Sequence, residues 1–187
     1  MTNRKSQIIE LTLKNIQEKG FTSFSYDHLA KKLGVTKASI HYHFEKKGDL
    51  GVAVCERIQH GLEGAYTFIK ESSMPAVEKP FAFILRRVQF LEQDGVCPIS
   101  ALQADYQELS PSMQEKIQEL SQMEIDVFVV LLKEAKQHGA LKSTNEEDLA
   151  SLAMLLISST KGALQYKRVL GEDFFQKTLE QLNELLK

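Results

Sequence analysis

The chain has 187 residues, 43% of them hydrophobic, with four prolines and ten glycines, a composition that excludes a disordered protein and favours helices almost throughout. Its net charge of −2 is unevenly distributed, because residues 1–50 carry nine basic and five acidic side chains (net +4) and the remainder carries −6; such a basic segment can steer nucleic acid, and chance asymmetry is the alternative explanation. Two cysteines are too few for a disulfide framework, no apolar run reaches about 18 residues and the N-terminus has no apolar signal region, so we expect a cytoplasmic protein without a membrane span.

Three short helices are predicted in the first fifty residues. The first covers residues 6–19 and ends at Gly20, since glycine adopts the backbone conformation that often follows a helix. Ser25 and Thr36 are residue types that cap helix N-termini, so a second helix is expected after Ser25 and a third from Thr36 to Phe44. The apolar residues expected to form their shared core are Ile9, Leu13, Ile16, Leu29, Leu33, Val35 and Ile40.

Six further helices are predicted in the rest of the chain. Asp49 is expected to cap the first of them, and Thr144 with Glu147 resembles a capping box at the start of the fifth. Their expected ranges are about 49–70, 80–93, 99–109, 110–137, 144–170 and 173–186. No strand is predicted, so the fold class is all-α with about nine helices, divided between a domain at residues 1–48 and a larger helical domain at residues 49–187.

The segment from Ser25 to Phe44 is typical of a helix-turn-helix. Two short capped helices are joined by a tight turn at Gly34, where glycine permits a positive φ. Small, polar and basic side chains on the outer surface of the second helix suit a DNA major groove, and Lys46 and Lys47 follow at a position for phosphate contacts. The outward-facing residues of that helix are Thr36, Lys37, Ala38, Ser39, His41 and His43.

A longer pattern surrounds this motif. It consists of Ile8-Ile9, Lys19-Gly20-Phe21, Ser25, Leu29-Ala30, Leu33-Gly34-Val35-Thr36-Lys37, Ile40-His41-Tyr42-His43-Phe44, Lys47 and Asp49-Leu50. Over essentially all of residues 6–54 the chain resembles the TetR family of transcriptional repressors. The resemblance implies that Thr36 caps the recognition helix and touches the DNA backbone, that Lys37, His41 and Tyr42 contact DNA, and that Lys47 binds a phosphate. The full set of expected DNA contacts is Ser25, Thr36, Lys37, Ala38, Ser39, His41, Tyr42, His43 and Lys47.

The same resemblance implies that the remaining residues form a homodimer and sense an effector. A two-fold dimer presents two recognition helices to successive major grooves, so a palindromic double-stranded DNA operator is expected. The last two predicted helices carry apolar and small side chains suited to a helix–helix interface, although the same faces also suit the core of a single chain. The expected interface residues are Leu152, Leu156, Ser159, Ala163, Phe175 and Leu179.

Cys97-Pro98 resembles an element of a TetR subgroup that opens a helix lining the regulatory pocket. At a helix start, the dipole favours a thiolate, which makes Cys97 a candidate sensor of electrophiles or oxidants; simple burial as a small apolar residue is the favoured alternative, and Cys55 is expected to be core. A mostly apolar small molecule is the expected effector. The candidate pocket residues, most of which also suit a core, are Phe83, Phe90, Cys97, Gln103, Tyr106, Met123, Phe128 and Tyr166.

An enzyme is not expected. The sequence has no Glu-x-x-His pair, no phosphate-binding glycine loop and no visible Ser/His/Asp arrangement, and no cofactor is predicted. His41 and His43 lie two residues apart and do not share a helix face, so no metal site is predicted either. The expected function is a repressor that leaves its operator when a small molecule binds or a thiol is modified. An activator and a protein-interaction module are the alternatives.

Overall fold

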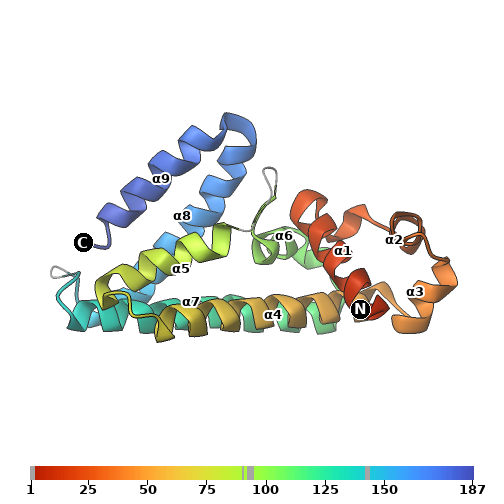
Figure 1. Ribbon diagram of the computed structural model, residues 1–187, viewed down its shortest axis with the longest axis horizontal. Coiled ribbons are helices and arrows are strands. Elements are labelled where there is room, and N and C mark those ends of the chain that lie inside the picture. The colour runs from red at the N-terminus through yellow and green to blue at the C-terminus, as the bar shows by residue number, and fades with distance from the viewer. Residues whose placement is uncertain (1–2, 90, 92–94, 142–143) are drawn as a thin grey trace. The chain divides into compact units, whose positions relative to one another are not determined.

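The computed structural model describes residues 3–89, 91, 95–141 and 144–187. Within these residues it contains α-helices, short 3-10 helices and no strand, which confirms the all-α prediction (Figure 1). The elements are α1 (Arg4–Lys19), η1 (Phe21–Ser23), α2 (Tyr26–Leu33), α3 (Lys37–His43), α4 (Lys47–Glu71), η2 (Ala76–Glu78), α5 (Lys79–Val88), α6 (Pro98–Ala104), η3 (Tyr106–Glu108), α7 (Pro111–Gln137), η4 (Glu146–Asp148), α8 (Leu149–Leu170) and α9 (Glu172–Glu184). No described helix is both long and apolar enough to cross a bilayer.

Several helix ends lie where the capping and turn residues predicted them. Gly20 follows α1 with a φ of 86°, and Gly171 separates α8 from α9 with a φ of 87°. Pro111 begins α7, where its missing N–H costs no hydrogen bond because the first turn of a helix leaves its donors unpaired. The predicted stop after Gln137 is also confirmed, with Gly139 at a φ of 98°.

Other predicted helix starts were wrong. α4 begins at Lys47, and Asp49 lies inside its first turn, where its carboxylate accepts the N–H of Lys46 at 2.9 Å. This is the return half of a capping box rather than an N-cap. The expected capping box at Thr144 does not form, since no side chain caps η4 or α8, and α8 begins at Leu149.

Two predicted helices are shorter than expected. α6 ends at Ala104 because Asp105 leaves the helical conformation, and the chain continues as η3 instead of a single helix to Leu109. α5 ends at Val88, and part of its predicted continuation, including Phe90, lies outside the described residues.

The contacts divide the chain into two compact units, and the first comprises Met1–His60 with Cys97–Leu120. α6 packs against α1 in this unit (Figure 1). α4 and α7 approach closely at Gly51, where a Cβ atom would lie 2.2 Å from the sulfur of Met113, so only glycine fits without displacing that side chain. The fully buried side chains of this unit include Ile8, Ile16, Leu29, Ile40, Leu50, Ile99 and Leu102.

The second unit comprises Gly61–Val96 with Ser121–Lys187. α8 and α9 lie side by side here, joined at Gly171 (Figure 1). An ionic group joins α5, α7 and α8, in which the buried Glu124 lies 3.6 Å from the half-buried Arg87 and 2.6 Å from the half-buried Lys161. Its buried apolar side chains include Phe83, Phe128, Leu131, Leu149, Leu156, Leu164, Phe175 and Leu179.

Candidate nucleic-acid interface

The predicted helix-turn-helix forms from α2, a turn at Gly34 and α3. Gly34 adopts the left-handed conformation with φ 64° and ψ 37°, which a residue with a Cβ adopts only at a cost. The N–H of Val35 then donates to the carbonyl of Ala30 at 3.0 Å, and the hydroxyl of Thr36 accepts the N–H of Ser39 at 3.2 Å. These bonds end α2 and begin α3 within three residues, as the sequence predicted.

Ile40 is the one fully buried side chain of α3, and the other residues of the helix are exposed or half-buried. Phe44, which follows the helix, is 4% exposed. Tyr42 is 86% exposed, a high value for a large aromatic side chain on an ordered helix. Exposed Lys31 and Lys32 in the last turn of α2 and exposed Lys46 add positive charge to this unit. A short, largely exposed helix in a unit that carries these lysines suits insertion into a major groove.

All nine predicted DNA contacts lie in the first unit, between the N-cap of α2 and the first turn of α4. The hydroxyl of Ser25 accepts the N–H of His28 at 3.3 Å, so this residue also holds the start of α2. The exposed members are Ser25, Thr36, Lys37, Ala38, His41 and Tyr42, and the half-buried members are Ser39, His43 and Lys47. Their contacts with DNA stay predictions.

An ion pair in the unbound protein holds Lys37. Its ammonium lies 2.7 Å from the carboxylate of Asp27, which belongs to the first turn of α2. Both side chains are more than half exposed, so water screens the attraction. Sequence reasoning missed Asp27, because only the folded turn at Gly34 brings the starts of two helices ten residues apart into contact.

The side chain of Lys47 contacts other residues of the same chain. Its ammonium donates to the carbonyl of Phe24 at 2.8 Å and lies over the rings of Phe21 and Phe24, 4.7 and 4.2 Å from their centroids. Desolvation lowers the pKa of Lys47, and the nearby carboxylate of Asp105 partly opposes this effect. The residue predicted to bind a phosphate therefore also ties α4 to the segment between α1 and α2.

Asp105 connects α6 to the start of η1. Its carboxylate accepts the N–H of Phe21 at 2.6 Å and that of Thr22 at 3.4 Å. Space is tight there, because a Cβ atom on Gly20 would lie 2.8 Å from Asp105 Oδ2. The sequence carried no signal for this contact, since the bonded residues are 84 positions apart.

His41 and Tyr26 pack against each other behind the exposed surface. Their ring centroids are 4.8 Å apart in an edge-to-face arrangement. The hydroxyl of Tyr26 is buried and has no hydrogen-bond partner in the described part of the chain. Burial raises the pKa of Tyr26 to about 12, with a smaller contribution from Asp49, so the phenol is uncharged at physiological pH.

The predicted pocket residues are divided between the two units. In the first unit Cys97 is buried, Gln103 is exposed, and the half-buried Tyr106 accepts a hydrogen bond from Gln118 at 2.6 Å. In the second unit the rings of Phe83 and Phe128 pack together with centroids 6.0 Å apart. Met123 is half-buried there, Tyr166 is exposed with its ring beside Phe174, and Phe90 lies outside the described residues. Their role in ligand binding stays a prediction.

Most of the predicted dimer residues pack within a single chain. Leu156, Ala163, Phe175 and Leu179 are at most 3% exposed, so they have almost no surface left to bury against a partner, and packing within the chain accounts for them. Leu152 and Ser159 are half-buried. The large exposed apolar residues of α8 are instead Met154, Leu155, Tyr166, Val169 and Leu170.

Comparisons with known proteins agree with this description. Residues 8–54 match the family model described as bacterial regulatory proteins, tetR family. A curated Staphylococcus aureus protein described as the biofilm operon icaADBC HTH-type negative transcriptional regulator IcaR is 23% identical over 155 residues, which cover 83% of this chain and 81% of that protein.

Solved structures extend the similarity over the whole chain. A TetR transcriptional regulator from Legionella pneumophila is 26% identical with a TM-score of 0.89, covering 100% of this chain and 99% of that one. Two others share the fold at lower identity. A TetR-family regulator from Agrobacterium tumefaciens has a TM-score of 0.85 at 19% identity and covers 96% and 95% of the two chains. The reduced form of E. coli NemR has a TM-score of 0.82 at 18% identity and covers 98% and 97%.

Proposed function

We propose that this chain, a transcriptional regulator of the TetR family, is a homodimeric repressor that inserts α3 into the major groove of a palindromic operator. The observation that carries the proposal is α3 itself, which is capped by Thr36 and anchored by Ile40, while its other residues are exposed or half-buried. Repression rather than activation is supported by the similarity to IcaR, whose description is that of a negative regulator. Residues 1–48 bind DNA in this proposal, and residues 49–187 supply the dimer contacts and the effector site.

The exposed face of α8 is the surface that we assign to the dimer. At about 100° per residue, Met154, Leu155, Tyr166 and Val169 fall within about 120° of the helix circumference, opposite the buried face that contains Leu156. These residues are 47%, 53%, 57% and 81% exposed in the single chain. A second copy covering this stripe removes it from water and sets the spacing of the two α3 helices.

Release from DNA is proposed to act through α6. Cys97 precedes this helix and Asp105 ends it, so a ligand or a modified thiol that displaces α6 pulls on the hydrogen bond to Phe21 beside the helix-turn-helix. α4 is the second connection, since it begins at Lys47 and continues into the second unit. The effector must bind the released state more tightly than the DNA-binding state, or the populations do not shift.

Selection of DNA sites by the purified protein tests the function. A palindrome with half-sites about one helical turn apart is the expected result, and its binding weakens as salt rises. No enrichment from a folded protein would contradict DNA binding and favour the protein-interaction module. A reporter gene with the selected site then separates repression from activation, which leave DNA binding equal but change transcription in opposite directions.

The thiol arm has its own test. Wild type and Cys97→Ser are treated with an alkylating reagent and their operator binding is compared. Release of wild type alone supports a sensor at Cys97. Cys55 is not expected to react, because burial raises its pKa to about 12 and keeps it protonated. If alkylation releases neither protein from the operator, release by a small molecule is the alternative that remains.

A further inference from the structure

One ring nitrogen of His41 is bound to the backbone of its own chain. Nδ1 lies 3.2 Å from the carbonyl oxygen of Glu45, four residues further along the chain. Because a carbonyl oxygen only accepts hydrogen bonds, Nδ1 carries the hydrogen, and Nε2 of the neutral ring is then an acceptor without one. Nε2 has no hydrogen bond or ion pair with any residue that the structure describes. The neutral, exposed side chain of His41 therefore has no N–H group left to offer to DNA.

The position of His41 on α3 favours a phosphate as its partner. The residue lies in the last turn of α3, whereas the first residues of a recognition helix contact most of the base edges. Its ring packs edge-to-face against Tyr26 of α2, with the centroids 4.8 Å apart, so His41 lies on the side of α3 that faces α2. In a helix-turn-helix the first helix crosses the DNA backbone, and a side chain between the two helices is near the same phosphates.

The neutral ring of His41 and a phosphate do not match as hydrogen-bonding partners. The oxygens of a DNA phosphate accept hydrogen bonds and have none to donate, and Nε2 of the neutral ring is also an acceptor. Protonation of Nε2 supplies a second donor and a positive charge while the bond from Nδ1 to Glu45 is kept. The charged ring can therefore bridge the Glu45 carbonyl and a phosphate, which the neutral ring cannot do.

The titratable side chains around His41 leave Nε2 open to DNA. Asp27 pairs with Lys37, and Asp49 accepts the N–H of Lys46, so both carboxylates have partners other than His41. Glu45 is exposed, and its carboxylate makes no ion pair with His41. The groups that surround His41 are Tyr26 and Asp27 of α2, Lys37 and His43 of α3, Glu45 and Lys46 after α3, and Asp49 of α4.

We propose that His41 binds a DNA phosphate only in its protonated form, so that each recognition helix takes up one proton when it binds the operator. This inference rests on the proposed function and adds pH as a regulator of the same surface. Linkage is reciprocal, so if DNA binding takes up a proton, protons strengthen DNA binding. Histidine changes its charge between pH 5 and pH 8, and operator affinity therefore falls as pH rises through this range.

Calorimetry in buffers of different ionisation enthalpy counts the protons taken up on binding. The probe is a DNA duplex carrying the palindrome selected at pH 6, titrated with the full chain at pH 7.5. We expect uptake of about one proton per bound chain and an affinity that falls at least about tenfold between pH 6 and pH 8. Operator binding without proton uptake overturns the proposal, because His41 then stays neutral in the complex. Failure to bind any DNA at pH 6 contradicts the proposed function as well, so the two failures are distinguishable.

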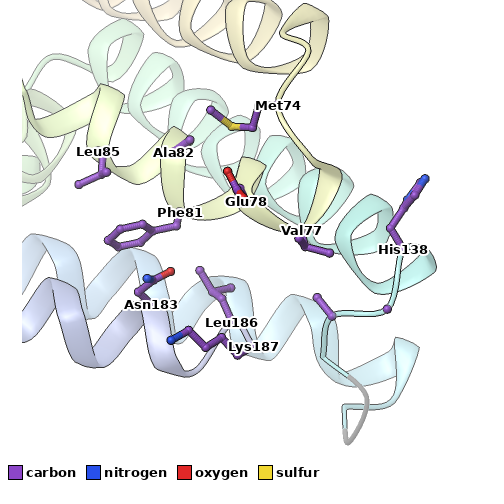
Figure 2. Close-up of a pocket in the computed structure, with 12 residues that line it drawn as sticks. Met74, Val77, Glu78, Phe81, Ala82, Leu85, His138, Asn183, Leu186 and Lys187 are labelled. Atoms are coloured by element: carbon purple, nitrogen blue, oxygen red, sulfur yellow. The ribbon is translucent and has the colours of Figure 1, made fainter.

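Two substitutions locate the proton. His41→Gln replaces the ring by an amide that does not titrate, so proton uptake should disappear and operator affinity should become nearly independent of pH. His138→Gln is the matched control, because Nδ1 of the exposed His138 also lies beside a backbone carbonyl, 2.8 Å from that of Glu134. Figure 2 shows His138 in the second unit, where it lines a cavity of about 720 Å³.

The control should take up protons and bind the operator like wild type. Proton uptake that persists in His41→Gln comes from another group and overturns the assignment, and so does a loss of uptake in His138→Gln. Thermal unfolding at pH 6 and pH 8 verifies that each variant is folded under the conditions of the titration.

Discussion

The ammonium of Lys37 lies 2.7 Å from the carboxylate of Asp27, so the basic residue expected to reach DNA from α3 is paired with an acid of α2 in the unbound protein. DNA binding by Lys37 then requires exchange of a carboxylate for a phosphate or a base edge. The pair is exposed, and exposed pairs contribute only about 0.2–1 kcal/mol, so the exchange is easy. If Lys37 contacts DNA as proposed, we expect Asp27 to lower operator affinity by competition more than it stabilises the fold.

Substitutions at this pair should separate binding from stability. Lys37→Ala should weaken operator binding about tenfold, change the preferred sequence and reduce the salt dependence by about one counterion. Asp27→Asn should bind the operator more tightly than wild type, with a melting temperature nearly unchanged. Fluorescence anisotropy across a salt series measures operator affinity and its salt dependence, and thermal melts measure stability. Lys133→Ala, at an exposed position of α7, is the control for loss of a positive charge. Weaker binding by Asp27→Asn would refute the competition.

Lys47 should show both of its roles when it is removed. Lys47→Ala loses the hydrogen bond to Phe24 and two ring contacts, and the free energy of unfolding should fall by about 1–3 kcal/mol. Operator affinity should also fall for all sequences alike, because a phosphate contact carries no base preference. Chemical denaturation and anisotropy are measured on the same preparation. Unchanged operator affinity in a folded variant means that the proposed docking is wrong.

Asp105 should link α6 to DNA binding. Asp105→Ala leaves the N–H of Phe21 without its carboxylate acceptor, so we expect a loss of about 1–3 kcal/mol in unfolding free energy and weaker operator binding. Asp105→Asn keeps an oxygen acceptor, so its unfolding free energy and its operator affinity should lie between those of wild type and Asp105→Ala. Exposed Glu108→Gln in η3 is the matched control. If Asp105→Ala destabilises the protein but binds the operator like wild type, α6 does not act through this bond.

The contrast between Thr36 and Asp105 explains which features the sequence could predict. Thr36, Gly34 and Ser25 act on neighbours within a few positions, so residue type and local order suffice to locate the helix-turn-helix. Asp105 and Lys47 bind groups 84 and 23 positions away, and such contacts exist only once the helices have packed. The buried Leu156 shows the same limit for surfaces, because apolar spacing identifies a helix face without saying what covers it.

The exposed face of α8 should control assembly. Leu155→Glu places a charge within the apolar stripe, which desolvation by a partner would penalise, so the variant should be monomeric at concentrations where wild type is a dimer. Operator affinity should fall with it, since one recognition helix remains per molecule. Light scattering after size exclusion gives the mass. Val130→Glu, at a 45% exposed apolar position of α7, is the control, and a monomeric mass for it as well would show that the effect is not specific to α8.

Tyr26 should reveal the cost of its buried hydroxyl. An unpaired buried polar group costs about 1–3 kcal/mol, so Tyr26→Phe should be as stable as wild type or more stable at pH 7. The pH dependence gives a second test. Burial raises the pKa of Tyr26 to about 12 in the folded protein, against an ordinary value of 10.0, so the unfolded chain loses the phenol proton at a lower pH than the folded chain. The stability that wild type gains from keeping Tyr26 protonated is therefore lost as pH rises from 10 to 12.

Tyr26→Phe has no such proton and should lose less stability than wild type over the same range. Thermal melts of both proteins at pH 7, 9, 10 and 11 make the comparison, in which all other titrating groups cancel to first order. A Tyr26→Phe variant that is less stable than wild type at pH 7 would mean that the hydroxyl has a hydrogen-bond partner. If the melting temperatures of the two proteins fall equally between pH 9 and pH 11, burial does not raise the pKa of Tyr26. Either result would also change the description of the surface behind α3, since the same ring supports His41.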